Sequence, residues 1–592
     1  MTAVAWTAPL LLPSLAALLA LLAGRVRTWL LAITPLPALA LALLGPLGPA
    51  PDLSWVLLDL RLGLDAVGRV LLATTALVWL GGGAAAASIT RRRPGSAALW
   101  QATLAGNVGV ALAADVVSLY VAFAVMTFAA YGLVVHERDA RAWRAGRVYV
   151  VMAVAGEAML LSGLMLAVGT TGTTATGEIA HLLADAPHRT LTVGLLTAGF
   201  AVKAGIVPLH VWLPLAHPAA PVPASAVLSG AMVKAGLVGW LVVLPIGTAG
   251  VTGPGAMLLI AGLVTATAGI ALGLTQHDPK VLLAYSTVSQ MGMIAVLVGV
   301  GLLLPAAAPI AVAGAALYAL HHGCNKAALF LGVGLHGRVA AAAGRRWVLV
   351  GTALAGLALA GAPLTGGWVA KVAVKDVVDL VAAPWAGRLA LLLSLLAAGT
   401  TALLARLVLL LARRPPPTST AVARRDSASP ASIDRWALAA WAGLLVAGVV
   451  GTWLSPAFLL TSARLPTMGV PSLLEALWPV ALGLGATAAV AGWRRDRSSE
   501  AAASPVVPPG DLVVLGERAG ERLRPLLRTA RRWASEGIAR GAAVAQRLQA
   551  RLRPGHGVDR LDRLLTRWQV TGGVFALLLA VLALTLTAGA GW

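Results

Sequence analysis

Apolar runs of about 20 residues recur along most of the chain, and they constrain its fold more than any other feature. This is the length that an α-helix needs to cross the hydrocarbon core of a bilayer. Of the 592 residues, 59% are hydrophobic and only 11% are charged, which is typical of a membrane protein rather than a soluble multidomain chain. We therefore predict an all-α polytopic membrane protein.

About sixteen spans account for these runs. We expect them at 3–23, 28–44, 64–87, 97–114, 116–135, 147–168, 191–215, 224–246, 253–275, 279–301, 306–336, 347–382, 385–411, 434–455, 472–493 and 568–588. The first run lacks a basic leader and more spans follow it, so we interpret it as a helix and not as a cleaved signal.

The loops between the spans alternate in charge. Odd-numbered loops carry most of the arginines, including those between residues 138 and 147, whereas even-numbered loops carry few. By the positive-inside rule the odd loops face the cytoplasm. Both termini are therefore expected on the outer side of the cell inner (cytoplasmic) membrane.

Several classes of cofactor and partner are not expected. The single cysteine, Cys324, is too little thiol for an iron–sulfur cluster or a disulfide framework, and no GxGxxG motif follows a strand-like run. The formal charge of +22 comes from arginines beside apolar spans, where positive charge sets topology and attracts anionic lipid rather than nucleic acid. We predict a chain without cofactor, metal site, covalent catalysis or redox activity of its own.

Lysine and arginine are distributed differently. The six lysines all lie in or beside apolar spans: Lys203, Lys234, Lys280, Lys326, Lys371 and Lys375. Arginine stays protonated, whereas a partly desolvated lysine can release its proton near neutral pH, so this distribution indicates titratable cations inside the bilayer. The alternative is that lysines near span ends extend to the headgroups, and it applies chiefly to Lys280 and Lys375.

Two of the spans are overlong and interrupted. The seventh carries Lys203 and breaks near Pro208, the twelfth breaks around 363–367, and the eighth carries Lys234. A lysine at the bilayer centre costs roughly 2.5 to 3.5 kcal/mol, and a broken span needs protein or water for its freed backbone groups. These features together predict a polar pathway inside a helix bundle.

Further ionisable residues are expected along this pathway. The candidates are Glu157, His321, His322, Lys326 and Lys371, with His210 and His217 as secondary candidates. His322 and Lys326 are four residues apart and so share one helix face, where both can titrate within reach of neutral pH. For a lone buried histidine such as His321, the alternative is a core hydrogen bond. Asp278 and Lys280, at the start of the tenth span, form either a gate or a simple helix cap.

Four stretches resemble one known family. They are KAGIVPLHVWLPLAHPAAPVPASAVLSGAMVKAG (203–236), DPKVLLAYSTVSQMG (278–292), HGCNKAALFLGVG (322–334) and PLTGGWVAK (363–371). The chain resembles the antiporter-like proton-conducting membrane subunits of complex I, of membrane hydrogenases of the hydrogenase-4 type, and of multisubunit Na⁺/H⁺ antiporters. The first two stretches are the most specific.

The resemblance implies both a fold and a proton path. The fold has two inverted five-helix repeats, spans 4–8 and 9–13, in which spans 7 and 12 are broken. The path at the membrane centre consists of Lys203, Lys234, His322, Lys326 and Lys371. The family usually places a glutamate in span five where this chain has Ala124, and Glu157 is our candidate replacement, since an anion nearby would favour protonated Lys203.

This interpretation divides the chain into six parts. We expect N-terminal transmembrane helices in 1–96, a first antiporter-like repeat in 97–246, a second in 253–411, peripheral transmembrane helices in 434–493, a cytoplasmic amphipathic arginine-rich segment in 494–567 and a C-terminal transmembrane helix in 568–592. Apolar residues recur with helical spacing in 526–552, and a disordered basic linker is the alternative there.

The function that the resemblance implies is that of a proton-translocating membrane subunit in an energy-converting complex. Its expected partners are other membrane subunits, lipid and protons, with Na⁺ as the alternative ion. Three alternatives stay open: Na⁺/H⁺ antiport, proton-coupled uptake of inorganic carbon, and an assembly scaffold that conducts nothing. The missing acid at Ala124 makes the scaffold conceivable.

Overall fold

The computed structural model describes most of the chain up to Val514 in two units, Met1–Val514 and Leu515–Trp592. The described residues are 3–22, 26–50, 60–90, 94–248, 251–339, 341–381, 385–413, 435–458, 469–496, 507–508, 510–514 and 517. The amphipathic helix expected in 526–552 and the span expected at 568–588 lie outside them. All that follows concerns the first unit.

The first helices are α1 (Ala3–Leu22), α2 (Val26–Ile33), α3 (Leu36–Leu44) and α4 (Ala66–Thr90). The single span expected at 28–44 is divided, because a turn at Thr34 and Pro35 separates α2 from α3. Proline removes a backbone donor and ends the preceding helix. The all-α prediction also missed a small antiparallel pair of two-residue strands, β1 (Gly48–Pro49) and β2 (Gly63–Leu64).

The next helices surround the first break. They are α5 (Pro94–Leu112), α6 (Val116–Val134), α7 (Ala140–Thr171), α8 (Thr176–Leu182), α9 (Arg189–Ala204), α10 (Leu213–Ala219), α11 (Val222–Val227), the π-helical turn η1 (Leu228–Met232) and α12 (Lys234–Val243). The expected loop before the sixth span was too long, because Arg141, Arg144 and Arg147 lie within the first turns of α7. Asp139 caps this helix early by accepting the N–H of Ala142 at 2.7 Å.

The remaining helices surround the second break. They are α13 (Thr252–Leu274), α14 (Pro279–Leu303), the 3₁₀ turn η2 (Pro305–Ala307), α15 (Ala308–His336), α16 (Ala342–Ala360), α17 (Gly366–Val378), α18 (Trp385–Ala412), α20 (Arg435–Phe458) and α21 (Val470–Asp496). Asp278 caps α14 and Pro279 occupies its first turn, which is a common helix start.

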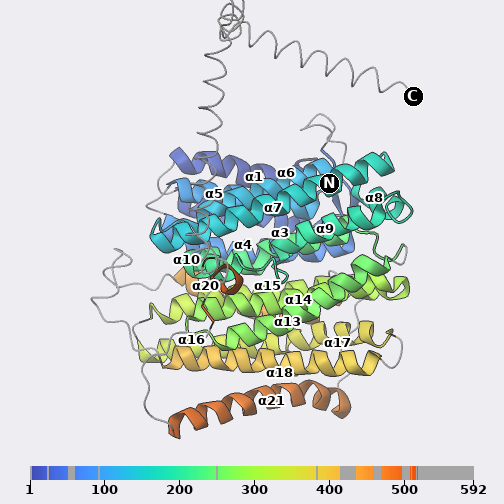
Figure 1. Ribbon diagram of the computed structural model, residues 1–592. Helices are drawn as coiled ribbons and strands as arrows, with labels where there is room; N and C mark the ends of the chain where they lie inside the picture. The colour runs from blue at the N-terminus through green and yellow to red at the C-terminus, as the bar shows by residue number, and fades with distance from the viewer. Residues whose placement is uncertain are drawn as a thin grey trace, which may run out of the picture. The chain divides into compact units, whose positions relative to one another are not determined.

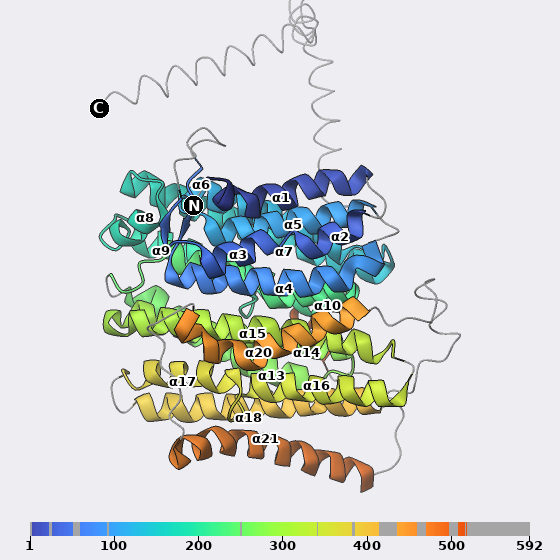
Figure 2. The ribbon, with the colours of Figure 1, turned by 180° about the vertical axis from the view of Figure 1, so that it is seen from behind.

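The long helices of this unit run side by side in successive layers (Figure 1). Seen from behind, α20 lies across α15 and α4, and these helices are in contact (Figure 2). Nearly every residue of α14 and α15 is buried, whereas apolar side chains such as Val151, Met165 and Ile260 are exposed on the outer helices. Such exposed apolar side chains suit contact with lipid.

Among the described residues, ten helices are long and apolar enough to cross a membrane. The prediction of a polytopic helical membrane protein is thus confirmed. The number of sixteen spans and the inverted repeats stay predictions.

Both predicted helix breaks are present. The first separates α9 from α10 and the second separates α16 from α17. In each, the helix ends at a glycine in the left-handed conformation, Gly205 with φ 75° and Gly361 with φ 78°. Glycine adopts this conformation without the steric cost of a Cβ atom, so it ends a helix cleanly. The side chain of Lys371 packs directly against Gly361.

We expect Gly361→Ala to destabilise the protein. A left-handed alanine costs roughly 1–2 kcal/mol, and its Cβ would also lie only 2.6 Å from Cε and 2.7 Å from Nζ of Lys371. Thermal unfolding in detergent would measure the loss. The matched control is Gly356→Ala in the same helix, where the new Cβ meets only an ordinary 3.4 Å contact with Leu404. An equal effect of both substitutions would contradict this account of the break.

Candidate functional site

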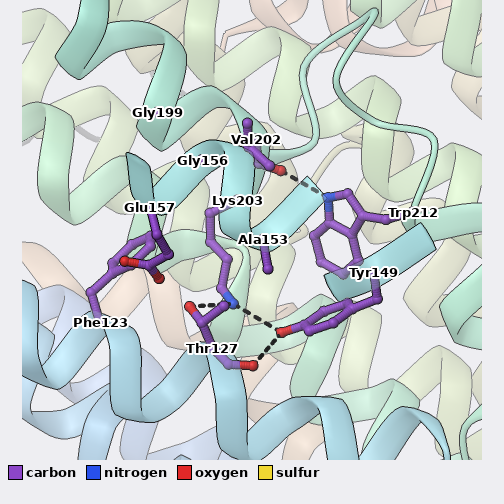
Figure 3. A pocket seen from close by; sticks show the side chains of 10 residues that line it. All are labelled: Phe123, Thr127, Tyr149, Ala153, Gly156, Glu157, Gly199, Val202, Lys203 and Trp212. Carbon is purple, nitrogen blue, oxygen red and sulfur yellow. Dashed lines mark hydrogen bonds between the residues drawn. The ribbon is translucent and has the colours of Figure 1, made fainter. Parts of the chain in front are cut away.

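Lys203 lies in the last turn of α9 and lines a small pocket between α6, α7 and α9 (Figure 3). Its Nζ donates to Thr127 Oγ1 at 3.2 Å and to the Tyr149 hydroxyl at 3.3 Å, and it lies 5.7 Å from the centre of the Phe123 ring. Tyr149 in turn donates to the carbonyl of Thr127 at 2.8 Å. The amine is therefore surrounded by oxygen atoms and aromatic faces, both of which stabilise a cation.

Glu157 of α7 lines the same pocket as Lys203. Its side chain is only 5% exposed, and neither carboxylate oxygen has a hydrogen-bond partner among the described residues. A buried carboxylate without partners is costly unless a cation or water is near. The pocket has a volume of about 20 Å³, which is space for one water molecule. Glu157 and Lys203 thus form a potential acid and amine pair.

Sequence reasoning missed both direct partners of Lys203. Thr127 lies one helical turn after Ala124, the position where the resemblance led us to seek an acid, and Tyr149 lies two turns before Glu157. Both hydroxyls are on faces that look plainly apolar in the sequence. The only signal in the sequence was their spacing: Thr127 shares a helix face with Ala124, and Tyr149 shares one with Glu157.

Lys234 begins α12, with one residue between it and the end of the π-helical turn η1. Its Nζ donates to the carbonyl of Ser229 at 2.5 Å, and the Ser229 hydroxyl is 2.7 Å from that of Thr287 on α14. A π-helical turn displaces the backbone from regular α-helical bonding and often marks a functional site. Lys234 is 3% exposed, so its amine lies in the protein interior and not at the lipid surface.

His322 and Lys326 lie on the buried face of α15, as their spacing predicted. Lys326 is fully buried and its Nζ donates to the carbonyl of Leu283 on α14 at 3.1 Å. Neither ring nitrogen of His322 has a partner among the described residues, and the same is true of His217, whose ring stacks on Phe330. An imidazole nitrogen without a protein partner can still form a hydrogen bond with a water molecule.

Lys371 follows the second break and donates to the carbonyl of Ala360, at the C-terminal end of α16. A cation at this end complements the helix dipole. His321 is placed differently: its Nδ1 lies 3.0 Å from Nδ2 of Asn325, which also donates to the carbonyl of Gly448 at 2.8 Å. His321 therefore makes the core hydrogen bond that we considered as its alternative role.

His210 lies within the first break and contacts a residue from far along the chain. Its Nε2 is 2.9 Å from Oδ2 of Asp511, and the Tyr285 hydroxyl donates to the same oxygen at 3.1 Å. Sequence reasoning did not identify Asp511 or Tyr285. The two contacting residues, His210 and Asp511, are 301 positions apart, so no local pattern could have paired them.

Asp278 acts as the cap of α14. Its Oδ1 accepts the backbone N–H of Lys280 at 2.8 Å, and its Oδ2 lies 3.4 Å from the exposed guanidinium of Arg141. The amine of Lys280 donates to the carbonyl of Ala220 in the turn between α10 and α11. A gating role for Asp278 and Lys280 stays a prediction.

The described part of the chain is thus a multipass helical membrane protein whose interior holds amines, histidines and a carboxylate beside two broken helices. Residues 113–397 match the family described as "NADH:quinone oxidoreductase/Mrp antiporter, TM". Over these residues the chain is similar to this antiporter-like family of membrane subunits, and the matched region contains both breaks and every pathway candidate named above.

Several relatives are named as components of a hydrogenase or subunits of dehydrogenases and oxidoreductases. Hydrogenase-4 component B of Escherichia coli is 33% identical over 231 residues, which are 36% of this chain and 33% of the relative. F(420)H(2) dehydrogenase subunit N of Methanosarcina mazei is 31% identical over 231 residues, which are 38% of this chain and 46% of the relative. This chain therefore spans one third to just under one half of these relatives.

Two solved structures share the fold. A chain in the Mrp complex from Dietzia sp. DQ12-45-1b superposes with a TM-score of 0.69 at 25% identity, covering 99% of this chain and 63% of that one. A chain of the membrane-bound sulfane sulfur reductase, an archaeal respiratory membrane complex, superposes with a TM-score of 0.63 at 19% identity. The match covers 82% of this chain and 99% of that one. Both are subunits of multisubunit membrane complexes.

Proposed function

We propose that this chain is a proton-translocating subunit of an energy-converting membrane complex. Protons enter the half that contains Lys203 and Glu157, pass Lys234 to His322 and Lys326, and leave near Lys371. Repulsion between neighbouring cations alternately holds and expels protons along this path. The chain itself performs no redox or covalent chemistry.

The burial of the central amines is the observation that carries this proposal. Lys203, Lys234 and Lys326 are 5%, 3% and 0% exposed, and their amines make hydrogen bonds only with neutral hydroxyls or backbone carbonyls. None of the three is in an ion pair among the described residues. Three unpaired amines in the interior of a bundle are costly, and such residues generally mark ion or proton pathways.

The finer architecture is part of the proposal. Spans 4–8 and 9–13 form two inverted repeats, and the left-handed glycines that end α9 and α16 support this because they place one equivalent break in each repeat. Both termini face the outer side of the membrane, as the arginine distribution suggests. The division of the chain into six parts follows from these repeats and this topology, and it is part of the same proposal.

The driving reaction belongs to partner subunits. Moving one elementary charge against 100 mV costs roughly 2.3 kcal/mol, and nothing proposed for this chain supplies that energy. Other membrane subunits must therefore deliver it. Membership of multisubunit complexes among the structural relatives supports this arrangement.

Exchange of Na⁺ for protons is the second candidate, and the likeness to a chain of the Mrp complex favours it. Proteoliposomes that hold the whole complex would separate the two functions. A pH-sensitive dye should report proton movement on energisation without Na⁺ if the chain pumps protons alone. A proton signal that appears only when a Na⁺ gradient is imposed would establish exchange instead, and no signal in either case would contradict both.

A further inference from the structure

We propose that Asp511 is a positioning residue that holds His210 in the broken helix and thereby loads protons onto the first half of the path. It docks there as part of a latch, which we define as the described residues 507–508 and 510–514. This inference rests on the proposed function, because it assigns a positioning residue to the same proton path.

Asp511 is buried, and its side chain has two hydrogen-bond partners from different helical regions. It is 7% exposed, and its Oδ2 is shared by Nε2 of His210 at 2.9 Å and the hydroxyl of Tyr285 at 3.1 Å. His210 belongs to the break between α9 and α10, whereas Tyr285 belongs to α14. One carboxylate oxygen therefore joins the first broken helix to a helix of the second half.

Other contacts fix the latch at this position. The side-chain amide of Gln276 donates to the carbonyl of Val507 at 3.0 Å, and Gly510 packs so closely on Leu215 of α10 that an added Cβ would lie 2.9 Å from its Cδ2. The short red turn of Asp511–Val514 can be seen beside α10 in Figure 1. The latch thus touches α10 and the turn before α14 as well as His210.

His210 has one ring nitrogen still available. Its Nε2 faces Asp511, and its Nδ1 is buried without a hydrogen-bond partner among the described residues. Since a carboxylate on one nitrogen fixes the tautomer and the ring orientation, Asp511 determines what the other nitrogen can accept or donate. His210 lies in the break that begins two residues after Lys203. Trp212, two residues after His210, lines the pocket of Lys203, and the proposal therefore assigns to His210 the proton that enters this half.

The docking of the latch should depend on pH. Burial raises the pKa of Asp511, but the hydrogen bonds and charge of His210, with the Leu512 N–H and the Tyr285 hydroxyl, outweigh burial and hold the pKa below its usual value. The titratable groups facing Asp511 among the described residues are His210 and Tyr285. An acid with a lowered pKa stabilises docking above its usual pKa, and this stabilisation is lost as the pH falls through the lowered value.

The docking is tested first, by cross-linking. In a Cys324→Ser background, the pair Leu215→Cys with Gly510→Cys should react with a short bifunctional thiol reagent in membranes at neutral pH. The matched control is Leu215→Cys with Leu512→Cys, because the Leu512 side chain is 45% exposed. Adding Asp511→Asn should reduce the cross-link. Equal cross-linking of the two pairs would show that the latch does not dock.

The functional consequence is tested in proteoliposomes that contain the whole complex. Asp511→Asn should lower proton flux at neutral pH by about 10-fold, the order of a hydrogen bond to a charged group, and change the pH profile. Asp511→Glu should restore most of it, and the exposed acid substitution Asp185→Asn should have no effect.

Failure of the latch and failure of the proton path are distinguishable. Suppose that the Leu215→Cys and Gly510→Cys pair forms the cross-link, but the pH profile of proton flux is the same in Asp511→Asn as in the wild type. The latch would then dock as proposed, and only the positioning role of Asp511 would be refuted. Proton flux that is lost in the Lys203→Ala variant but unaltered in Asp511→Asn would also refute it while supporting the path.

Discussion

Replacement of Lys326 by alanine should lower proton translocation by the whole complex roughly 100-fold or more, the range that a positioned proton-transfer group contributes. Lys326 is fully buried, lies on the same face of α15 as His322, and donates to the carbonyl of Leu283 on α14. In our account it is where protons pass between the two halves. Vesicle acidification at a fixed driving rate measures the effect.

A second variant separates titration from simple structural support. Lys326→Arg keeps the positive charge but cannot release its proton in the accessible pH range, so it should be as defective as alanine. The matched control is Lys375→Ala on α17, where the lysine is 47% exposed and pairs with Glu475 at 2.6 Å. Active Lys326→Arg together with inactive Lys326→Ala would mean that charge or packing, and not proton release, is required.

Replacement of Glu157 by glutamine should lower proton flux by an order of magnitude or more. Glu157 shares the pocket of Lys203, and its carboxylate is the acidic group that faces this amine among the pocket residues. Because the attraction between opposite charges falls with distance, a change in the separation of Glu157 and Lys203 should change the proton occupancy of the amine. The measurement is the same vesicle assay.

The glutamate prediction has its own conservative variants. Glu157→Asp keeps the charge and should retain much of the flux, whereas Glu475→Gln removes a half-exposed acid on α21 and should leave flux nearly intact. If Glu157→Gln translocated protons at the normal rate, Glu157 would not replace the acid missing at Ala124. Thr127 and Tyr149 alone would then have to tune Lys203.

The breaks and the buried lysines could be predicted from the sequence because each violates a rule of membrane helices. Pro208 and the stretch around 363–367 interrupt long apolar spans, and Lys203, Lys234 and Lys326 stand where lipid-facing residues would be expected. Such violations are costly, and proteins retain them at functional sites. The structure places all three lysines in the interior.

The partners of those residues could not be predicted. Thr127, Tyr149 and Ser229 are small or amphipathic residues that fit any membrane helix, and only the packing of α6, α7 and α9 and the turn η1 directs them to an amine. Asp511 is harder still, because it lies in a segment expected to face the cytoplasm. The predicted start of α7 was wrong for a local reason. Asp139 caps the helix, which therefore begins earlier than hydropathy indicates.

Proton flux through the whole complex in proteoliposomes, compared between the wild type and the combined Lys203→Ala and Lys234→Ala variant, tests the central claim most directly. Lys375→Ala serves as the control for loss of a lysine outside the path. Our account predicts that the combined variant assembles normally and moves almost no protons, while the control behaves like the wild type. Undiminished flux in the combined variant would contradict the account.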